Sequence, residues 1–147
     1  MAISFQRFRE IVFQLLYSHD FSKADEEDML PFMMKEFLVP RKKIAEAQEM
    51  KEKIYSRLVE IDELIRAASQ NYSFERITRV ELNILRLAIY ELLIGLIPPK
   101  VAISEAVRLA RKYGGSEGGA FVNAVIDKIY QEGRKDAAIE IPAGETA

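Results

Sequence analysis

The stretch VELNILRLAIYELLIGL, residues 80–96, decides the fold. It is apolar on nearly every side of a helix, and Asn83, Arg86 and Glu91 interrupt its most apolar part, from Leu82 to Leu96. A segment this short and this charged does not cross a bilayer. We therefore predict a buried central helix in which Arg86 and Glu91 are either paired or reach a surface, because a bare buried charge is costly.

After this helix, the sequence predicts two more. Pro98-Pro99 should end the central helix, and a helix from about Ile103 to Tyr113 follows. Gly114 suits the left-handed position just past that helix. The last helix is expected to begin at Ser116 and to close at Gly133, with five inward side chains, namely Phe121, Val122, Val125, Ile126 and Ile129.

Before the central helix, apolar residues also recur at helical spacing. Ser4 should cap a first helix that reaches about Ser18, with a core stripe of Phe5, Phe8, Val12, Leu15 and Leu16. Asp28 should cap a short second helix that Val39-Pro40 stops. Apolar positions keep one phase from Ala47 to Ala68, which predicts the longest helix, and a short turn is expected around residues 74–77. Strand-like alternation is essentially missing, so the fold class is all-α.

Composition limits the classes of function. The 147 residues are 49% hydrophobic, enough for one domain over residues 1–133, whereas residues 134–147 lack a period and are expected to be a disordered tail. The absence of cysteine rules out disulfides, thiolate metal sites and cysteine nucleophiles, and with no apolar leader it favours the cytosol and no membrane. The net charge of -2 and the pI near 5.6 are low for an unaided nucleic-acid binder, so any RNA-binding cations must be clustered or helped by a partner.

Two helix faces are candidate RNA-binding surfaces. Opposite the core stripe of the first helix lies a row of Gln6, Arg9, Phe13 and Tyr17, and a cation beside two rings suits single-stranded RNA. The other interpretation is that this helix is sandwiched and Phe13 is buried. The helix after Pro99 has a basic outer face made of Lys100, Ser104, Arg108, Arg111 and Lys112. This face either binds phosphates or is simply solvated.

No catalytic group, metal site or cofactor site is predicted. His19 is the single histidine and lies near a helix end. The loop Gly114–Gly119 has Ala120 and Phe121 where a phosphate-binding loop requires Lys and then Ser or Thr, so we interpret it as a turn between helices.

Three motifs resemble the NusB family. Residues 79–92, RVELNILRLAIYEL, resemble its signature I/V-L-R-x-A-x-Y-E-L. A second family motif, P-x-x-V-A-I-N-E-A-V-x-L-A-K-x-F/Y-G, resembles residues 99–114, PKVAISEAVRLARKYG. A third, F-V-N-G-x-L-D, resembles Phe121-Val122-Asn123 with Ile126-Asp127. With the first helix, the resemblance covers about Ser4 to Tyr130.

The resemblance implies about seven helices in two small packed bundles, about residues 1–70 and 71–133. It also implies a transcription antitermination factor, not an enzyme, which binds boxA-type single-stranded RNA together with the ribosomal protein NusE in an RNA polymerase antitermination complex on ribosomal RNA operons. The chain is expected to be a monomer or a homodimer.

Site residues follow from the same resemblance. It places Arg7, Arg9, Tyr17, Glu81 and Phe121 at or near RNA, to which the basic face adds Lys100, and it assigns Tyr113 and Glu117 to the NusE side. Phe5 and Gln6 stand where family members often carry cations. The alternative function is therefore a protein-binding or self-associating module with little RNA affinity of its own. The same domain also occurs fused to RNA cytosine methyltransferases, an activity that the missing cysteine disfavours.

Overall fold

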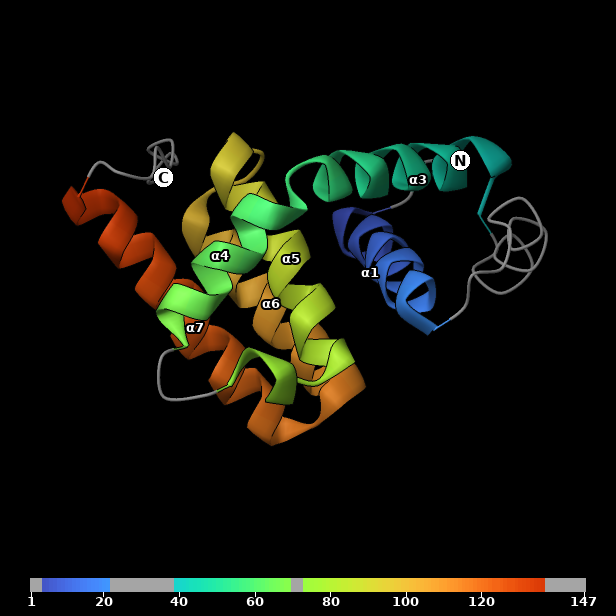
Figure 1. The fold of residues 1–147 in the computed structure, drawn as a ribbon. Coiled ribbons are helices and arrows are strands. Elements are labelled where there is room, and N and C mark those ends of the chain that lie inside the picture. The colour runs from blue at the N-terminus through green and yellow to red at the C-terminus, as the bar shows by residue number, and fades with distance from the viewer. Residues whose placement is uncertain (1–3, 22–38, 70–72, 137–147) are drawn as a thin grey trace. The chain divides into compact units, whose positions relative to one another are not determined.

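In the computed structural model of the chain, the described residues are 4–21, 39–69 and 73–136. These residues form helices and turns and no strand, which confirms the all-α class (Figure 1). The elements are α1 (Phe5–Phe21), α3 (Arg41–Ser56), α4 (Leu58–Ala68), the 3-10 helix η1 (Phe74–Arg76), α5 (Arg79–Ile94), α6 (Pro99–Gly114) and α7 (Ser116–Asp136). The helix predicted after Asp28 falls on residues 22–38, outside the described residues.

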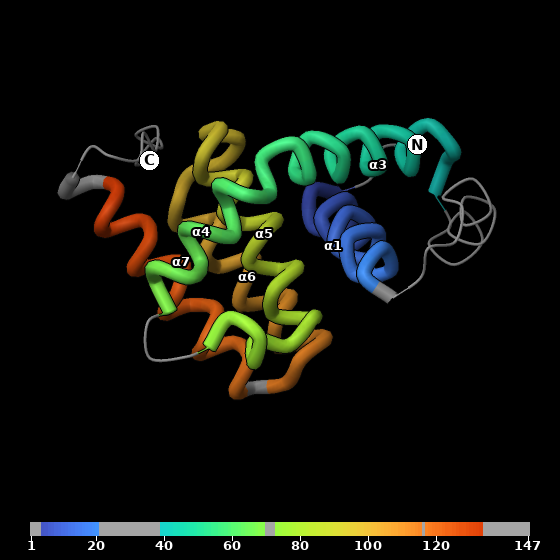
Figure 2. The backbone as a smooth tube through the Cα atoms, viewed as in Figure 1, coloured from blue at the N-terminus to red at the C-terminus, as the bar shows by residue number. Residues whose placement is uncertain are grey.

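The chain divides into two compact units, residues 1–56 and residues 57–147. The boundary therefore lies at the end of α3, earlier than the division near residue 70 that the sequence suggested. In the N-terminal unit α1 packs against α3, and Figure 2 shows both backbones. The Ser4 hydroxyl accepts a hydrogen bond from the Arg7 N–H (3.1 Å), which confirms Ser4 as the cap of α1. The helix continues past Ser18 to Phe21.

The long helix predicted up to Ala68 is in fact two helices. Arg57 leaves helical geometry, with φ -118° and ψ 18°, and separates α3 from α4. The hydroxyl of Ser56 donates to the Lys53 carbonyl (2.5 Å), and the Arg57 guanidinium holds the Glu60 carboxylate in the next turn. Serine competes for backbone groups in this way, which weakens a helix interior. The apolar period hides the break because Ile54 and Ile61 are both buried.

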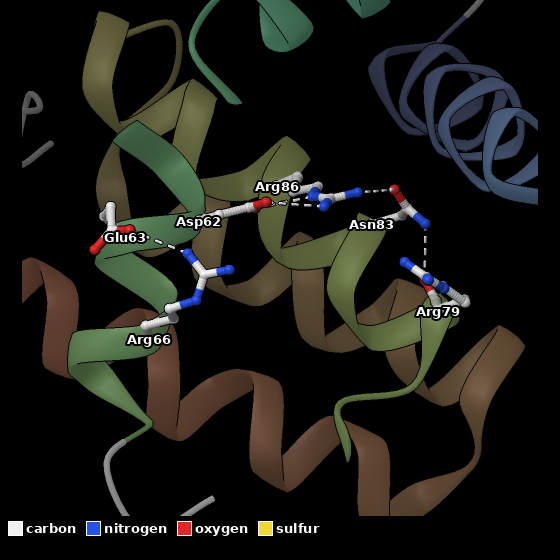
Figure 3. Close-up of polar contacts among 6 residues, drawn as sticks. All are labelled: Asp62, Glu63, Arg66, Arg79, Asn83 and Arg86. Atoms are coloured by element: carbon white, nitrogen blue, oxygen red, sulfur yellow. Dashed lines mark hydrogen bonds and ion pairs between the residues drawn. The ribbon is translucent and has the colours of Figure 1, made fainter. Parts of the chain in front are cut away.

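Helix α5 is the centre of the C-terminal unit, as predicted. It contacts α4, α6 and α7, and every residue from Leu82 to Leu93 is buried. The charged Arg86 is held by Asp62 of α4 through two hydrogen bonds, Nε to Oδ1 (3.0 Å) and Nη2 to Oδ2 (2.9 Å) (Figure 3). Its Nη1 also donates to the Asn83 side chain (3.3 Å). The predicted pairing of Arg86 is therefore confirmed.

Specific residues fix both ends of α5. Thr78 and Glu81 form a capping box: the Thr78 hydroxyl accepts from the Glu81 N–H (3.1 Å), and the Glu81 carboxylate accepts from the Thr78 N–H (3.2 Å). At the other end Gly95 adopts the left-handed conformation, with φ 65°. The helix therefore stops at Ile94, two residues before the predicted end at about Leu96, because a glycine in this geometry lets the backbone turn back on the last carbonyls.

The neighbouring helices differ from prediction mainly at their ends. Helix α6 starts at Pro99, since proline lacks only an N–H that a first turn leaves unused. Gly114 is still helical, and the positive φ (87°) belongs to Gly115. Helix α7 starts at Ser116 as predicted but passes Gly133 and ends at Asp136, so the first three residues of the predicted tail are helical. The rest of that tail lies outside the described residues.

Candidate nucleic-acid interface

The face of α1 that the sequence pointed outward is largely buried. Arg9 is 4% exposed and Phe13 is 1% exposed, so of the two interpretations of this row the structure agrees with the one in which Phe13 is buried. Burial extends around most of α1 from Arg9 to Leu16, so little of this part of the helix is open to solvent. Because Arg9 is buried, replacing it would perturb folding as well as any contact with RNA.

Phe5 was predicted to be buried but is exposed. It was assigned to the core stripe, yet 73% of it is exposed, because the first turn of α1 extends beyond the buried part of the helix. The Arg9 guanidinium lies 5.5 Å from the centre of the Phe5 ring. Arg7 and Tyr17 are both half-buried, and the Tyr17 ring lies 5.8 Å from that of Phe13. The N-terminal unit thus offers an aromatic ring and a cation at the start of α1.

The basic face of α6 has the predicted sidedness. Ala102, Ala106 and Ala110 are buried on one side, whereas Lys100, Arg111 and Lys112 are exposed on the other. Arg108 is half-buried and donates to the Glu105 carboxylate through Nη2 (3.2 Å), so part of its charge is already compensated. The Lys112 ammonium lies 5.6 Å from the centre of the Tyr113 ring.

Three glycines lie where α5, α6 and α7 meet, and we call this place the α5–α7 corner, made of Gly114, Gly118, Gly119, Glu81 and Arg111. A methyl group added at Gly118 would lie 3.4 Å from Oε2 of Glu81. One added at Gly119 would lie 3.1 Å from Cγ of Arg111. Gly118 and Gly119 therefore bring two charged side chains against the first turn of α7.

The corner gathers four of the candidate residues. Tyr113 lies in the last turn of α6, Glu117 lies in the first turn of α7, and Phe121 follows one turn later. The packing at Gly118 adds Glu81. Tyr113, Phe121 and Glu81 are half-buried and Glu117 is exposed. Lys100 lies far from the corner: it precedes Tyr113 by thirteen positions on α6, which corresponds to roughly 20 Å along the helix.

Two contributors to the corner were missed in the sequence. The Thr78 hydroxyl donates to Oε1 of Glu81 (3.0 Å), so the capping box orients a candidate site residue. The Thr-x-x-Glu spacing is a known start signal and could have revealed it. No spacing rule would have revealed the packing of Gly118 against Glu81, because it joins two helices.

Metal and membrane sites were searched over the described parts of the chain. Within residues 4–21, 39–69 and 73–136, no three His, Cys, Asp or Glu side chains gather as metal ligands would. Over the same residues, no helix is both long and apolar enough to span a membrane. His19 is exposed, and its ring lies 4.7 Å from that of Tyr55.

These features define an all-helical protein that presents cations, carboxylates and rings at helix ends. The profile of the NusB family matches residues 6–131. The transcription antitermination protein NusB of Anaeromyxobacter sp. (strain Fw109-5) is 38% identical over 130 residues, which cover 88% of this chain and 91% of that protein. The chain belongs to the NusB family, as its motifs suggested.

Solved structures agree with this assignment. NusB of T. maritima superimposes with a TM-score of 0.77 at 36% identity, covering 90% of this chain and 94% of that chain. A crystal structure of antitermination factors NusB and NusE in complex with dsRNA matches with a TM-score of 0.73 at 26% identity, covering 86% of this chain and 96% of that chain.

Proposed function

We propose that this chain is a noncatalytic transcription antitermination factor of the cytoplasm that binds boxA-type single-stranded RNA together with NusE. It would act within an RNA polymerase antitermination complex and support transcription of ribosomal RNA operons. The observation that carries the proposal is the match over residues 6–131 to a family with relatives named for antitermination. The similarity to a NusB that was crystallised with NusE and RNA supports the two partners.

The surface chemistry suits RNA contacted by a pair of proteins. Exposed cations of α6, such as Lys100 and Arg111, can neutralise phosphates. The Phe121 ring can stack on an unpaired base, and the Glu81 carboxylate can accept hydrogen bonds from base amino groups. Because the chain carries a net charge of -2, a partner that supplies further cations would raise the affinity.

The corner also supplies a surface for the protein partner. Tyr113 and Glu117 flank the turn between α6 and α7, and the Lys112 ammonium lies 5.6 Å from the centre of the Tyr113 ring. We assign these two residues to NusE from the family resemblance, and tyrosine is a residue type that is enriched in protein interfaces.

A binding titration tests the function. A boxA-like RNA, a scrambled RNA of the same composition and a duplex of the boxA-like RNA are each titrated with and without NusE, at roughly 50 and 200 mM salt. We expect NusE to tighten binding to the single-stranded boxA-like RNA most strongly. Affinity that is equal for all three RNAs and unaffected by NusE would refute the proposal.

The burial of Arg9 and the exposure of Phe5 favour one second candidate, a protein-binding or self-associating module. An exposed ring in place of a free cation suits an apolar partner. Gel filtration over a concentration series and a pulldown with NusE in the absence of RNA distinguish this candidate: it requires association without RNA.

A further inference from the structure

The N-terminal unit contains a pocket that no part of the proposed function uses. It has a volume of about 280 Å³ and is lined by Phe5 and Phe8 of α1 and by Lys43 and Glu46 of α3. All four residues belong to one unit, so the pocket is formed within it. We call it the Phe5 pocket.

The aromatic wall of the pocket is open to solvent yet restrained. Phe5 is 73% exposed, so its ring contributes little to the core. The Arg9 guanidinium, itself buried, lies 5.5 Å from the ring centre and limits its movement. A ring held in place loses less entropy when another flat ring stacks on it.

The polar wall of the pocket offers both a donor and an acceptor. The Lys43 ammonium lies 3.1 Å from Oε2 of Glu46, and 34% and 40% of these side chains are exposed. Ammonium groups donate to ring nitrogens and carbonyls of bases, and carboxylates accept from their amino groups. Such a pair can read the edge of a nucleobase that stacks on Phe5.

Size and charge narrow the choice of occupant. Pockets that enclose drug-sized ligands measure about 300 to 1,000 Å³, so this one suits a single flat ring and not a helix or a folded domain. Arg41 and Lys42 precede Lys43 and are exposed, and neither α1 nor α3 has an acidic residue in its first turn. A base in a nucleic-acid strand, which has negatively charged phosphates on both sides, matches these cationic surroundings.

We propose that the Phe5 pocket binds one unstacked base of a single-stranded RNA, with Phe5 as the stacking surface and Lys43 and Glu46 at the base edge. This subsite rests on the proposed RNA binding and adds a contact in the N-terminal unit to those of the α5–α7 corner.

Affinity measurements on Phe5 variants test the stacking. Base stacking on an aromatic ring contributes enough that Phe5→Ala should weaken binding of the boxA-like RNA, measured with NusE present, by about tenfold. Phe5→Trp should bind at least as tightly as the native chain. Phe5→Leu, which keeps the apolar character without the ring, should bind as weakly as Phe5→Ala.

The matched control is Val59→Ala. Val59 is an exposed apolar residue of the other unit, 81% exposed, and its loss should leave RNA affinity unchanged. Circular dichroism should show that all four variants fold, since each changes an exposed side chain.

Photocrosslinking gives a readout that a purely structural role of Phe5 would not change. A boxA-like RNA bearing one photoreactive base is irradiated in complex with the chain and NusE, and the linked peptide is found by mass spectrometry. Trypsin cleaves after Arg7, so a crosslink at Phe5 should stay on the peptide that ends there, and it should disappear in Phe5→Ala.

Three results would overturn the subsite, and they are distinguishable from failure of the proposed function. Native affinity in both Phe5→Ala and Phe5→Leu would show that no base stacks on this ring. Native affinity in Phe5→Leu alone would show that the pocket takes an apolar group. Loss of NusE binding or of self-association in Phe5→Ala, measured without RNA, would assign the pocket to a protein. If the native chain binds no RNA even with NusE, the proposed function itself fails.

Discussion

Replacing Asp62 with alanine should lower the free energy of unfolding by about 3 kcal/mol. The Asp62 and Arg86 side chains are 13% and 7% exposed, and two hydrogen bonds of 3.0 and 2.9 Å join them. Removing the carboxylate strands a buried guanidinium, a change that costs roughly 3 to 5 kcal/mol in proteins. We expect the lower end of that range, because water reaches part of Asp62 and Asn83 keeps its own bond to Arg86 (3.3 Å).

The neighbouring residue is the matched control. Glu63 follows Asp62 on α4 and pairs with Arg66 at 3.1 Å, but these side chains are 67% and 47% exposed (Figure 3). An exposed pair is worth at most about 1 kcal/mol, so Glu63→Ala should change stability by less than roughly 0.5 kcal/mol. Both substitutions introduce alanine into the same helix, where alanine is the best helix former, so propensity cannot explain a loss in one of them.

Urea titrations followed by circular dichroism measure the difference. Asp62→Ala should lower the midpoint without changing the slope. The double variant Asp62→Leu with Arg86→Met should recover most of the loss, since an apolar pair removes both buried charges at once. Equal stability of Asp62→Ala and Glu63→Ala would refute the reasoning, as would a double variant less stable than Asp62→Ala.

Three further predictions concern single residues. Gly115→Ala should lower the free energy of unfolding by about 1 to 3 kcal/mol. The loss comes from backbone strain alone, because φ is 87° and no atom lies within 4 Å of an added methyl group. Gly118→Ala, in helical geometry, is the control and should not destabilise the chain in the same urea titration. Thr78→Ala should cost about 1 kcal/mol by removing the cap of α5, whereas Thr78→Ser, which keeps the hydroxyl, should lose little of the melting temperature. Burial lowers the pKa of Lys51 below its usual 10.5, against the opposing effect of Glu52. As pH rises toward 10.5, Lys51 in the folded chain therefore loses its proton before Lys51 in the unfolded chain does. The native chain should then gain stability relative to Lys51→Met in unfolding measurements from neutral to alkaline pH. A constant difference in stability between the two chains would contradict the lowered pKa.

The sequence predicted a helix well where its apolar side chains are all buried in a single core. Helix α5 is the clearest case, since a segment apolar on all sides can only be stable when it is surrounded. The break at Arg57 could not be predicted from the period, because Ile54 and Ile61 keep the same phase on either side of it. The burial of Lys51 could not be predicted for a related reason: the apolar period favours Met50 as the core residue, whereas Met50 is half-buried and Lys51 is 1% exposed. A long aliphatic stem lets lysine occupy a position that its charge seems to exclude.

The candidate site was harder to predict than the fold. The predicted stripes assigned Phe5 to the core and Arg9 to the outer row, although residues four apart are neighbours on a helix. Spacing does not say which part of α1 other elements cover, and the burial of Arg9 and the exposure of Phe5 reverse the assignment. The α5–α7 corner depends on Gly118 and Gly119 touching side chains of two other helices. Contacts of this kind are set by tertiary packing, which a local pattern does not encode.

The α5–α7 corner and the start of α3 differ in charge and therefore suit different contacts. The α5–α7 corner carries the carboxylates of Glu81 and Glu117, which repel phosphates but can accept hydrogen bonds from bases or from a basic partner. The start of α3, with Arg41, Lys42 and Lys43, has cations without an acidic residue in its first turn. Because the net charge is -2, phosphates must be held by local groups of cations, such as these and the exposed Lys100 and Arg111 of α6. The carboxylates of the corner favour a cationic protein beside the RNA, which agrees with the proposed pairing with NusE.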